Sequence, residues 1–101
     1  MNAKPSKREF NAHLIDVCEH IVRSIVKQPE LVEVSLDVQR EQLTILVSSA
    51  DRGVVIGRGG QNLMMIESSL LLALAYLDQT GDGSPLLLSL PSLEVRAVNE
   101  A

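Results

Sequence analysis

The apolar side chains near the start of the chain have the spacing of one helical face. These apolar positions are Phe10, Leu14, Val17, Cys18, Ile21, Val22 and Ile25. Ser6 followed by Glu9 is a capping-box pattern, which predicts that the helix begins at Lys7. Pro29 disfavours a helical conformation in the residue before it, so the helix is expected to end near Lys27.

Apolar and polar residues then alternate in two short segments. In the first segment Val32, Val34, Leu36 and Val38 alternate with Glu33, Ser35 and Asp37. In the second, the apolar positions are Leu43, Ile45 and Val47. A period of two is typical of a half-buried strand. The polar stretch from Gln39 to Gln42, which has no glycine, predicts a turn between two antiparallel strands.

The middle of the chain predicts two helices separated by a glycine-rich break. Asp51 is placed to cap a short helical turn that contains Val54, Val55 and Ile56. Residues 57–60 break this turn, and a long apolar helix follows over residues 61–77. The predicted core positions of the long helix are Leu63, Ile66, Leu70, Leu74 and Leu77.

The last part of the chain predicts a loop and one more strand. Residues 81–85 have a loop composition, and residues 86–90 are expected to form the strand. Residues 93–98 either extend that strand past Pro91 or form a tail. The order helix-strand-strand-helix-helix-strand predicts the α+β class, with helices on one face of a three-stranded sheet. We expect a single domain over residues 1–101, with its core at about 8–95 and short flexible termini.

Composition limits the classes of function. The chain has 101 residues and a net charge of −4, which argues against nucleic-acid binding by bulk charge alone. Phe10 and Tyr76 are its only aromatic rings, too few for a base-stacking platform. A single cysteine excludes an intramolecular disulfide, and the longest apolar run is too short to span a membrane. The polar start of the chain lacks a signal-peptide core, so a cytoplasmic location is expected.

The segment from Asp51 to Leu63 is the one stretch with recognisable chemistry. Glycines permit positive φ angles and close approach of another backbone, and the helix that follows directs its first N–H groups into the turn. These features are suited to holding a phosphate group. Arg58 and Arg52 add positive charge with bidentate geometry, and Ile56 and Leu63 flank the turn as apolar groove residues.

This combination resembles the type II KH domain and, more narrowly, the small bacterial stand-alone KH family of RNA-binding proteins. The resemblance covers roughly residues 8–95. It implies a mixed three-stranded sheet backed by three helices, and a cleft for about four single-stranded nucleotides. The implied phosphate-contacting loop consists of Gly57, Arg58, Gly59 and Gly60, with Ile56, Gln61 and Asn62 at the edge of the cleft. Members of this family are also implicated in pairing with a second KH-containing protein or with themselves.

Charge is unevenly distributed around this segment. Residues 52–66 carry two basic groups and no acidic group, whereas the long helix after the turn has Glu67 and neither Lys nor Arg. Any RNA contact is therefore limited to a short basic island, which predicts modest affinity. The leading hypothesis is non-catalytic binding of single-stranded RNA by a regulatory or chaperone-like protein.

The alternative hypothesis is a protein-interaction or dimerisation module with weak or lost RNA binding. It depends on the long helix, which is apolar on more than one face at Met64, Met65, Leu71, Leu72 and Tyr76. Either this helix is buried on several sides, or it exposes an apolar patch. Neither a catalytic arrangement nor a cofactor motif is found. No metal site is expected either, because His13 and His20 lack a third ligand at useful spacing.

Overall fold

A computed structural model describes residues 7–78 and 91–98. Its elements, in chain order, are α1 (Lys7–Ile25), the 3-10 helix η1 (Pro29–Leu31), β1 (Glu33–Asp37), β2 (Gln42–Val47), α2 (Arg52–Ile56), the 3-10 helix η2 (Arg58–Gly60), α3 (Gln61–Asp78) and β3 (Ser92–Ala97). This order agrees with the predicted α+β class. No helix in the two described stretches is both long and apolar enough to cross a bilayer.

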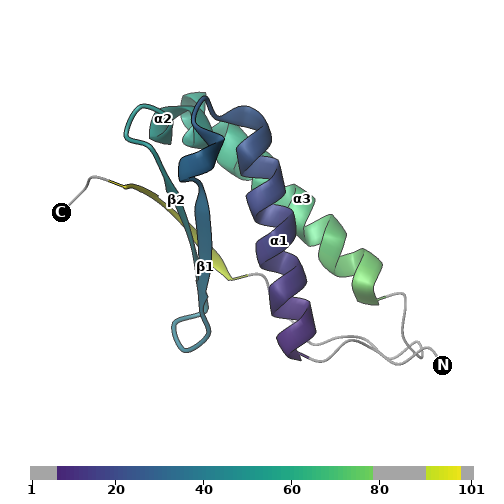
Figure 1. Cartoon of the computed structure of the whole chain (residues 1–101). Coiled ribbons are helices and arrows are strands. Elements are labelled where there is room, and N and C mark those ends of the chain that lie inside the picture. The colour runs from purple at the N-terminus through teal and green to yellow at the C-terminus, as the bar shows by residue number, and fades with distance from the viewer. Residues whose placement is uncertain (1–6, 79–90, 99–101) are drawn as a thin grey trace.

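The three strands form one mixed sheet with β2 in the centre (Figure 1). β1 pairs with β2 in the antiparallel sense, as predicted, and β3 pairs with β2 in the parallel sense. The register aligns Val34, Ile45 and Val95 across the sheet. All three side chains are buried, because alternate residues of a strand point to the same face and this face meets the helices.

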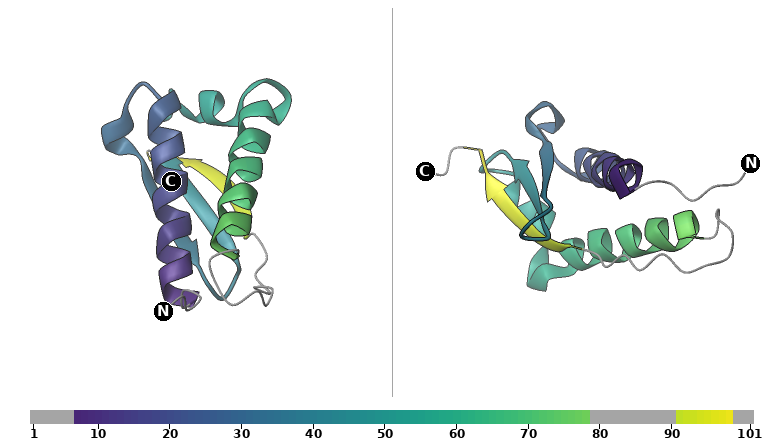
Figure 2. Two further views of the ribbon diagram at one scale, coloured as in Figure 1. Left: turned by 90° about the vertical axis from the view of Figure 1, so that its right-hand side faces the viewer. Right: turned by 90° about the horizontal axis from the view of Figure 1, so that it is seen from below.

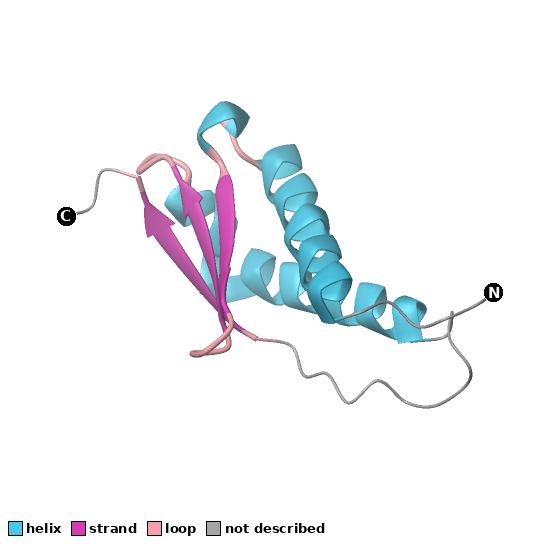
Figure 3. Ribbon diagram, turned by 60° about the horizontal axis from the view of Figure 1, so that its bottom comes forward, coloured by secondary structure: helices cyan, strands magenta, loops and turns pink. Residues whose placement is uncertain are grey.

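Both long helices lie on the same side of the sheet, as Figures 2 and 3 show. α1 packs against α3 and against β1, and α2 packs against α3 and β3. The predicted helical stripe on α1 buries Leu14, Cys18 and Val22, which follow one another at intervals of four residues. Ile66 and Leu70 of α3 complete this core, while the side chains of Leu74 and Leu77 lie outside those that the structure describes.

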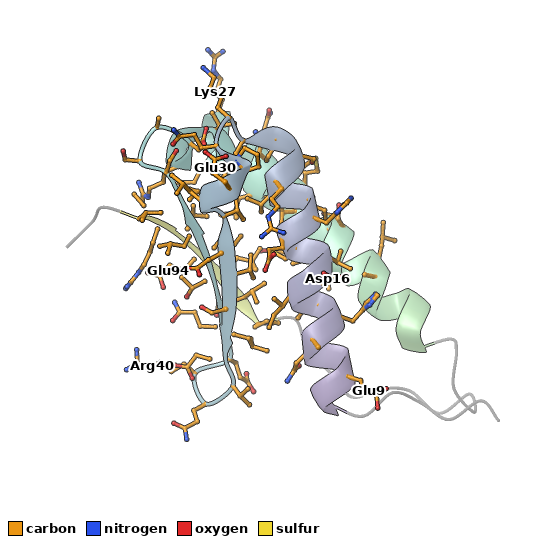
Figure 4. The ribbon with its side chains drawn as sticks, viewed as in Figure 1. Glu9, Asp16, Lys27, Glu30, Arg40 and Glu94 are labelled. Atoms are coloured by element: carbon orange, nitrogen blue, oxygen red, sulfur yellow. The ribbon has the colours of Figure 1, made fainter. Side chains whose placement is uncertain are left out.

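The opposite face of the sheet is polar. Gln42 Nε2 donates a hydrogen bond of 2.6 Å to Glu94, and Arg96 Nε donates one of 2.8 Å to the same carboxylate. Figure 4 shows Glu94 on the side of the sheet away from α1, with Arg40 at the β1–β2 hairpin. A sheet with one polar face needs helices on the other face only, which is the arrangement predicted from the order of the elements.

The structure sets two boundaries that the sequence analysis predicted only approximately or left open. α1 ends at Ile25, earlier than expected from Pro29 alone, since the backbone N–H groups of Lys27 and Gln28 bond to the Asp51 carboxylate instead of continuing the helix. β3 occupies residues 92–97, so the segment after Pro91 is the strand itself, whereas the predicted strand at residues 86–90 lies outside the described residues. Residues 92–97 are placed in the sheet by pairing with β2, a contact that local sequence does not encode.

Candidate nucleic-acid interface

The glycine segment joins α2, a helix of five residues, to α3, a helix of eighteen. Gly57, Gly59 and Gly60 have φ angles of 77°, 64° and 80°. Side chains of L-residues disfavour this region, so three of the four positions favour glycine. Arg58 contributes the only side chain to this short turn, as the sequence predicts.

Asn62 holds the turn closed from the first turn of α3. Its Nδ2 donates a 2.6 Å hydrogen bond to the carbonyl oxygen of Val54 in α2. A Cβ added to Gly57 would lie only 2.8 Å from the Asn62 backbone nitrogen and 2.9 Å from its Cγ. Asn62, expected at the edge of a binding cleft, therefore also stabilises the conformation of the turn and makes glycine necessary at position 57.

The outer surface of the turn is open. A Cβ added to Gly59 or to Gly60 would meet no atom within 4 Å, and the Arg58 side chain is exposed. Within the turn, the Gly60 N–H donates to the Gly57 carbonyl at 3.1 Å. The N–H groups of Arg58 and Gly59 lie at the start of this helical turn. Backbone N–H groups at that position have no acceptor within the helix. The turn thus presents backbone donors and a guanidinium, a combination that binds anions.

Arg52 lies at the other end of α2 and contacts β3. Its Nε donates a 3.2 Å hydrogen bond to the Val95 carbonyl oxygen. The sequence placed Arg52 and Arg58 together in one basic island, but the structure separates them by the length of α2. Arg58 is the arginine within the glycine turn, and Arg52 ties α2 to the edge of the sheet.

The apolar flanks of the turn lie where the sequence placed them. Ile56 and Leu63 are half-buried, because each packs against the hydrophobic core while part of its surface stays accessible. Gln61, the first residue of α3, is exposed. The predicted site residues from Ile56 to Asn62 are therefore contiguous on one end of the molecule, around the start of α3.

Asp51 departs from its predicted role. It occupies the N-cap position of α2, but its side chain makes no capping hydrogen bond. Its Oδ1 accepts the Lys27 N–H at 3.0 Å, and its Oδ2 accepts the Gln28 N–H at 3.0 Å and the Ser48 hydroxyl at 2.9 Å. The Lys27 backbone N–H, followed by the Gln28 N–H and the Ser48 hydroxyl, lowers the pKa of this carboxyl below its ordinary value even though the side chain is buried.

Sequence reasoning missed this long-range contact because its partners lie more than twenty positions apart along the chain. The contact brings the end of α1 next to the start of α2. Figure 4 shows Lys27 projecting from the end of the molecule where α2 lies. An aspartate before a short helix predicts a helix cap. The local sequence does not show whether its carboxylate caps that helix or accepts hydrogen bonds from a distant segment.

The long helix α3 exposes several apolar side chains. Met64 is 66% exposed, Met65 44%, Leu71 49% and Leu72 73%. These four residues, which we call the α3 apolar patch, fall at spacings of seven and one and so share one side of the helix. Of the two possibilities left open by the sequence, the structure supports the exposed patch at these positions, while the Tyr76 side chain lies outside the described residues.

We next consider the His, Cys, Asp and Glu side chains of the described residues. Across residues 7–78 and 91–98, no group of three or more His, Cys, Asp or Glu side chains is arranged to hold a metal ion. His13 and His20 are exposed on α1. Cys18 is fully buried, and burial, followed by the nearby Glu19 charge, raises the pKa of its thiol to about 12. This cysteine therefore acts as a small core residue.

Comparison with known proteins gives consistent relatives. A stretch of the chain, residues 15–77, matches the KhpA/KhpB KH domain. An RNA-binding protein KhpA of Mycobacterium leprae (strain TN) is 44% identical over 50 residues, which cover 48% of this chain and 62% of that protein. RNA-binding proteins KhpA of Mycobacterium bovis and Mycobacterium tuberculosis are 43% identical over 54 residues, covering 52% of this chain and 68% of theirs. No solved structure is a significant match.

The stretch that matches the family includes the glycine turn. The match to the first of these relatives spans less than two thirds of its length. The matched segment 15–77 nevertheless covers more than half of this chain and contains most of α1, the β1–β2 hairpin, α2, the glycine turn and nearly all of α3. This chain belongs to the KhpA/KhpB family of KH domains.

Proposed function

We propose that this protein binds single-stranded RNA without catalysing a reaction, as a cytoplasmic regulatory or chaperone-like protein. Residues 1–101 would act as a single KH-like domain. The proposed RNA-binding residues are Arg52, Ile56, Gly57, Arg58, Gly59, Gly60, Gln61 and Asn62. No metal or other cofactor is required, because KH domains clamp about four nucleotides through loop contacts to their backbone.

The observation that carries this proposal is the open glycine turn at the start of α3. It combines positive φ angles, an unobstructed outer surface and the exposed Arg58. Membership of a KH family supports the same conclusion, as do relatives whose names describe them as RNA-binding proteins. Half-buried Ile56 and Leu63 provide aliphatic surface for bases, so the scarcity of aromatic rings is no obstacle.

Electrostatics limits the strength of this binding. The chain has a net charge of −4, and α3 carries no basic residue to support the turn. Each phosphate contact by a cationic side chain contributes about 0.7 to the salt slope for a single strand. We therefore expect a shallow dependence of RNA affinity on salt concentration, with Arg58 supplying about one such contact.

Reversing the charge of the turn tests the proposal. The probe is a fluorescein-labelled single-stranded RNA of mixed sequence, about twelve nucleotides long, so that several four-nucleotide sites are available. Fluorescence anisotropy should show binding by the parent and loss of binding by the double variant Arg58→Asp, Gly59→Asp. Gly59 has room for a side chain, and aspartate tolerates positive φ better than most residues, so the variant is expected to fold.

The double variant Gln39→Asp, Arg40→Asp is the matched control. Both residues are exposed in the β1–β2 hairpin, outside the glycine turn, and their replacement changes the net charge by the same amount as Arg58→Asp, Gly59→Asp. This control should retain RNA binding with at most a small loss. Equal affinities of the parent and the Arg58→Asp, Gly59→Asp variant would reject the proposed site. Equal losses of affinity in this variant and in the control would show that only the net charge of the protein matters.

The α3 apolar patch supports a second candidate function. Exposed apolar side chains of this size on one helix face are typical of protein interfaces. The chain would then serve as a protein-interaction or dimerisation module with weak or lost RNA binding. The proposed partner is a second copy of this chain or a second KH-containing protein.

Light scattering during size-exclusion chromatography distinguishes the second function. A patch that joins two copies predicts a dimer for the parent and a monomer for Leu72→Glu, because a buried unpaired carboxylate disrupts an apolar interface. Gln39→Glu introduces the same charge at an exposed position of the β1–β2 hairpin, away from α3, and should leave the dimer intact. A parent that remains monomeric at high concentration would contradict self-association.

A further inference from the structure

The short helix α2 cannot set its own orientation. It has five residues, fewer than an isolated helix needs to be stable in water. Its position relative to α1 and the sheet must therefore come from contacts made by its side chains and by its ends. The start of α2 holds the one buried carboxylate found among the described residues, that of Asp51, which is 1% exposed.

Asp51 connects three segments that are separate along the chain. Its carboxylate accepts the backbone N–H groups of Lys27 and Gln28 after α1, and the hydroxyl of Ser48 after β2. Its own carbonyl accepts the Val55 N–H at 3.0 Å, which begins the hydrogen-bond ladder of α2. One residue thus joins the end of α1, the end of β2 and the helix that leads into the glycine turn.

We infer that Asp51 is a positioning residue for nucleic-acid binding, because its buried hydrogen bonds fix the orientation of α2 and hence of the glycine turn. This inference rests on the proposed RNA-binding function. Asp51 does not touch the ligand in this scheme. It keeps the turn in the orientation in which backbone donors and Arg58 face a single strand. Less conformational entropy is then lost when the RNA binds.

Charge provides a way to separate this role from simple electrostatics. A carboxylate near a phosphate-binding turn repels RNA, so removing its charge should strengthen binding if electrostatics were its only effect. Loss of positioning has the opposite sign, since the turn would then spend only part of its time in the binding orientation. The direction of the change in affinity therefore decides between the two effects.

Asp51→Asn is the test variant. It keeps the size of the side chain but replaces one acceptor oxygen with an NH2 donor, which faces N–H or O–H donors in the present arrangement. We expect about a tenfold weaker affinity for the labelled single-stranded RNA, which corresponds to a turn oriented for binding about a tenth of the time. We also expect about tenfold faster amide exchange at Val55 and Gly57, the α2 amides that report local opening of this helix.

Two control variants reproduce the other effects of this change, which are the loss of one negative charge and a lower global stability. Glu30→Gln removes one negative charge from an exposed position of η1, at the same end of the molecule (Figure 4), and should leave affinity unchanged or slightly higher. Ile45→Val removes a buried methylene from the middle of β2 and lowers global stability. It should change neither the RNA affinity of the folded protein nor the relative exchange of the α2 amides.

The outcomes are distinguishable from those of the proposed function. If Asp51→Asn is folded by circular dichroism and binds RNA as tightly as the parent, the inference is overturned, whereas a parent that binds no RNA rejects the proposed function itself. If Asp51→Asn does not fold, Ser48→Ala removes one of the three donors and should produce a smaller loss of affinity with the same faster exchange. An unchanged affinity in a folded Ser48→Ala variant with faster α2 exchange would also overturn the inference.

Discussion

The β1–β2 hairpin and the α2–α3 turn use positive φ angles in different ways. The β1–β2 hairpin turns between Asp37 and Gln42, and Glu41 there adopts a φ of 51° although it has a full side chain. The α2–α3 turn places three glycines in the same region of conformational space. Glycine is thus not required at every positive φ angle of this chain, but it is required at position 57, where a Cβ would overlap Asn62.

Each turn also depends on an aspartate, and the two aspartates act over different distances. Asp37 accepts the N–H groups of Gln39 and Arg40 at 3.1 Å each, in a local turn exposed to solvent. Asp51 accepts donors that lie 23 and 24 positions earlier in the chain. The hairpin is therefore stabilised locally, while the proposed binding turn is oriented by tertiary structure. The hairpin turn reverses the direction of the chain, whereas the α2–α3 turn also holds the proposed binding surface in a fixed orientation.

Gly57→Ala should produce the largest effect, since it forces a side chain into the glycine turn. The new Cβ meets the Asn62 backbone at 2.8 Å and must adopt a φ of 77°. Together the left-handed conformation and the steric overlap are expected to lower the free energy of unfolding by about 3 kcal/mol. Urea denaturation followed by circular dichroism measures this change, and RNA binding should be lost in any folded fraction.

Gly53→Ala is the control, in the helix that ends just before Gly57. Gly53 lies inside α2, and an added Cβ there meets nothing within 4 Å. Because alanine favours the helix over glycine, this variant should gain about 0.5–1 kcal/mol of stability. If Gly57→Ala were no less stable than Gly53→Ala, the requirement for glycine at the turn would be refuted.

The next effect is a difference in acid stability between the two aspartates. Three hydrogen bonds hold the pKa of Asp51 below its ordinary value in the folded state. The largest effect is that of the Lys27 backbone N–H, followed by the Gln28 backbone N–H and the Ser48 hydroxyl. A lowered pKa stabilises the fold at a pH above the unfolded-state value of about 3.9, and this stability is lost as pH falls through the folded-state pKa. Below about pH 4, the parent should therefore lose stability more steeply than Asp51→Asn.

Urea denaturation at a series of acid pH values tests this expectation. Asp37→Asn is the comparison variant, because asparagine forms the same local turn and the position is exposed. Its stability should follow that of the parent closely at neutral pH, whereas Asp51→Asn should be clearly less stable there. Parallel pH curves for the parent and Asp51→Asn would contradict a role for the buried carboxylate.

Local patterns were sufficient for most of the fold. The alternation through Val34 and Ile45 predicted a half-buried hairpin, and the helical spacing of Leu14, Cys18 and Val22 predicted the inner face of α1. The glycine turn was also predictable, because its conformation depends on residues adjacent in sequence. These features could be predicted for one physical reason. Each is determined by the periodicity or by the allowed φ angles of a short segment.

The details that local patterns misassigned or left open depend on contacts between distant segments. The strand at residues 92–97 is placed by pairing with β2, whereas the sequence analysis left residues 93–98 as either a strand extension or a tail. The carboxylate of Asp51 was assigned to a local cap because its true partners, Lys27 and Gln28, are close only in three dimensions. Likewise, the exposure of Leu72 follows from how α3 packs on α1, which hydropathy alone does not reveal.

The smallest predicted effect concerns Glu41 of the hairpin. Its φ of 51° is disfavoured for a residue with a Cβ, so Glu41→Gly should raise the free energy of unfolding by up to about 1 kcal/mol, reduced by the greater freedom of glycine in the unfolded chain. Denaturant midpoints for the parent and variant measure the change, and Gln39→Gly serves as the control on the same turn. RNA affinity should stay the same in both variants, because this turn lies outside the proposed site. A loss of stability in Glu41→Gly as large as that in Gln39→Gly would show that the positive φ angle of Glu41 does not lower the stability of the parent.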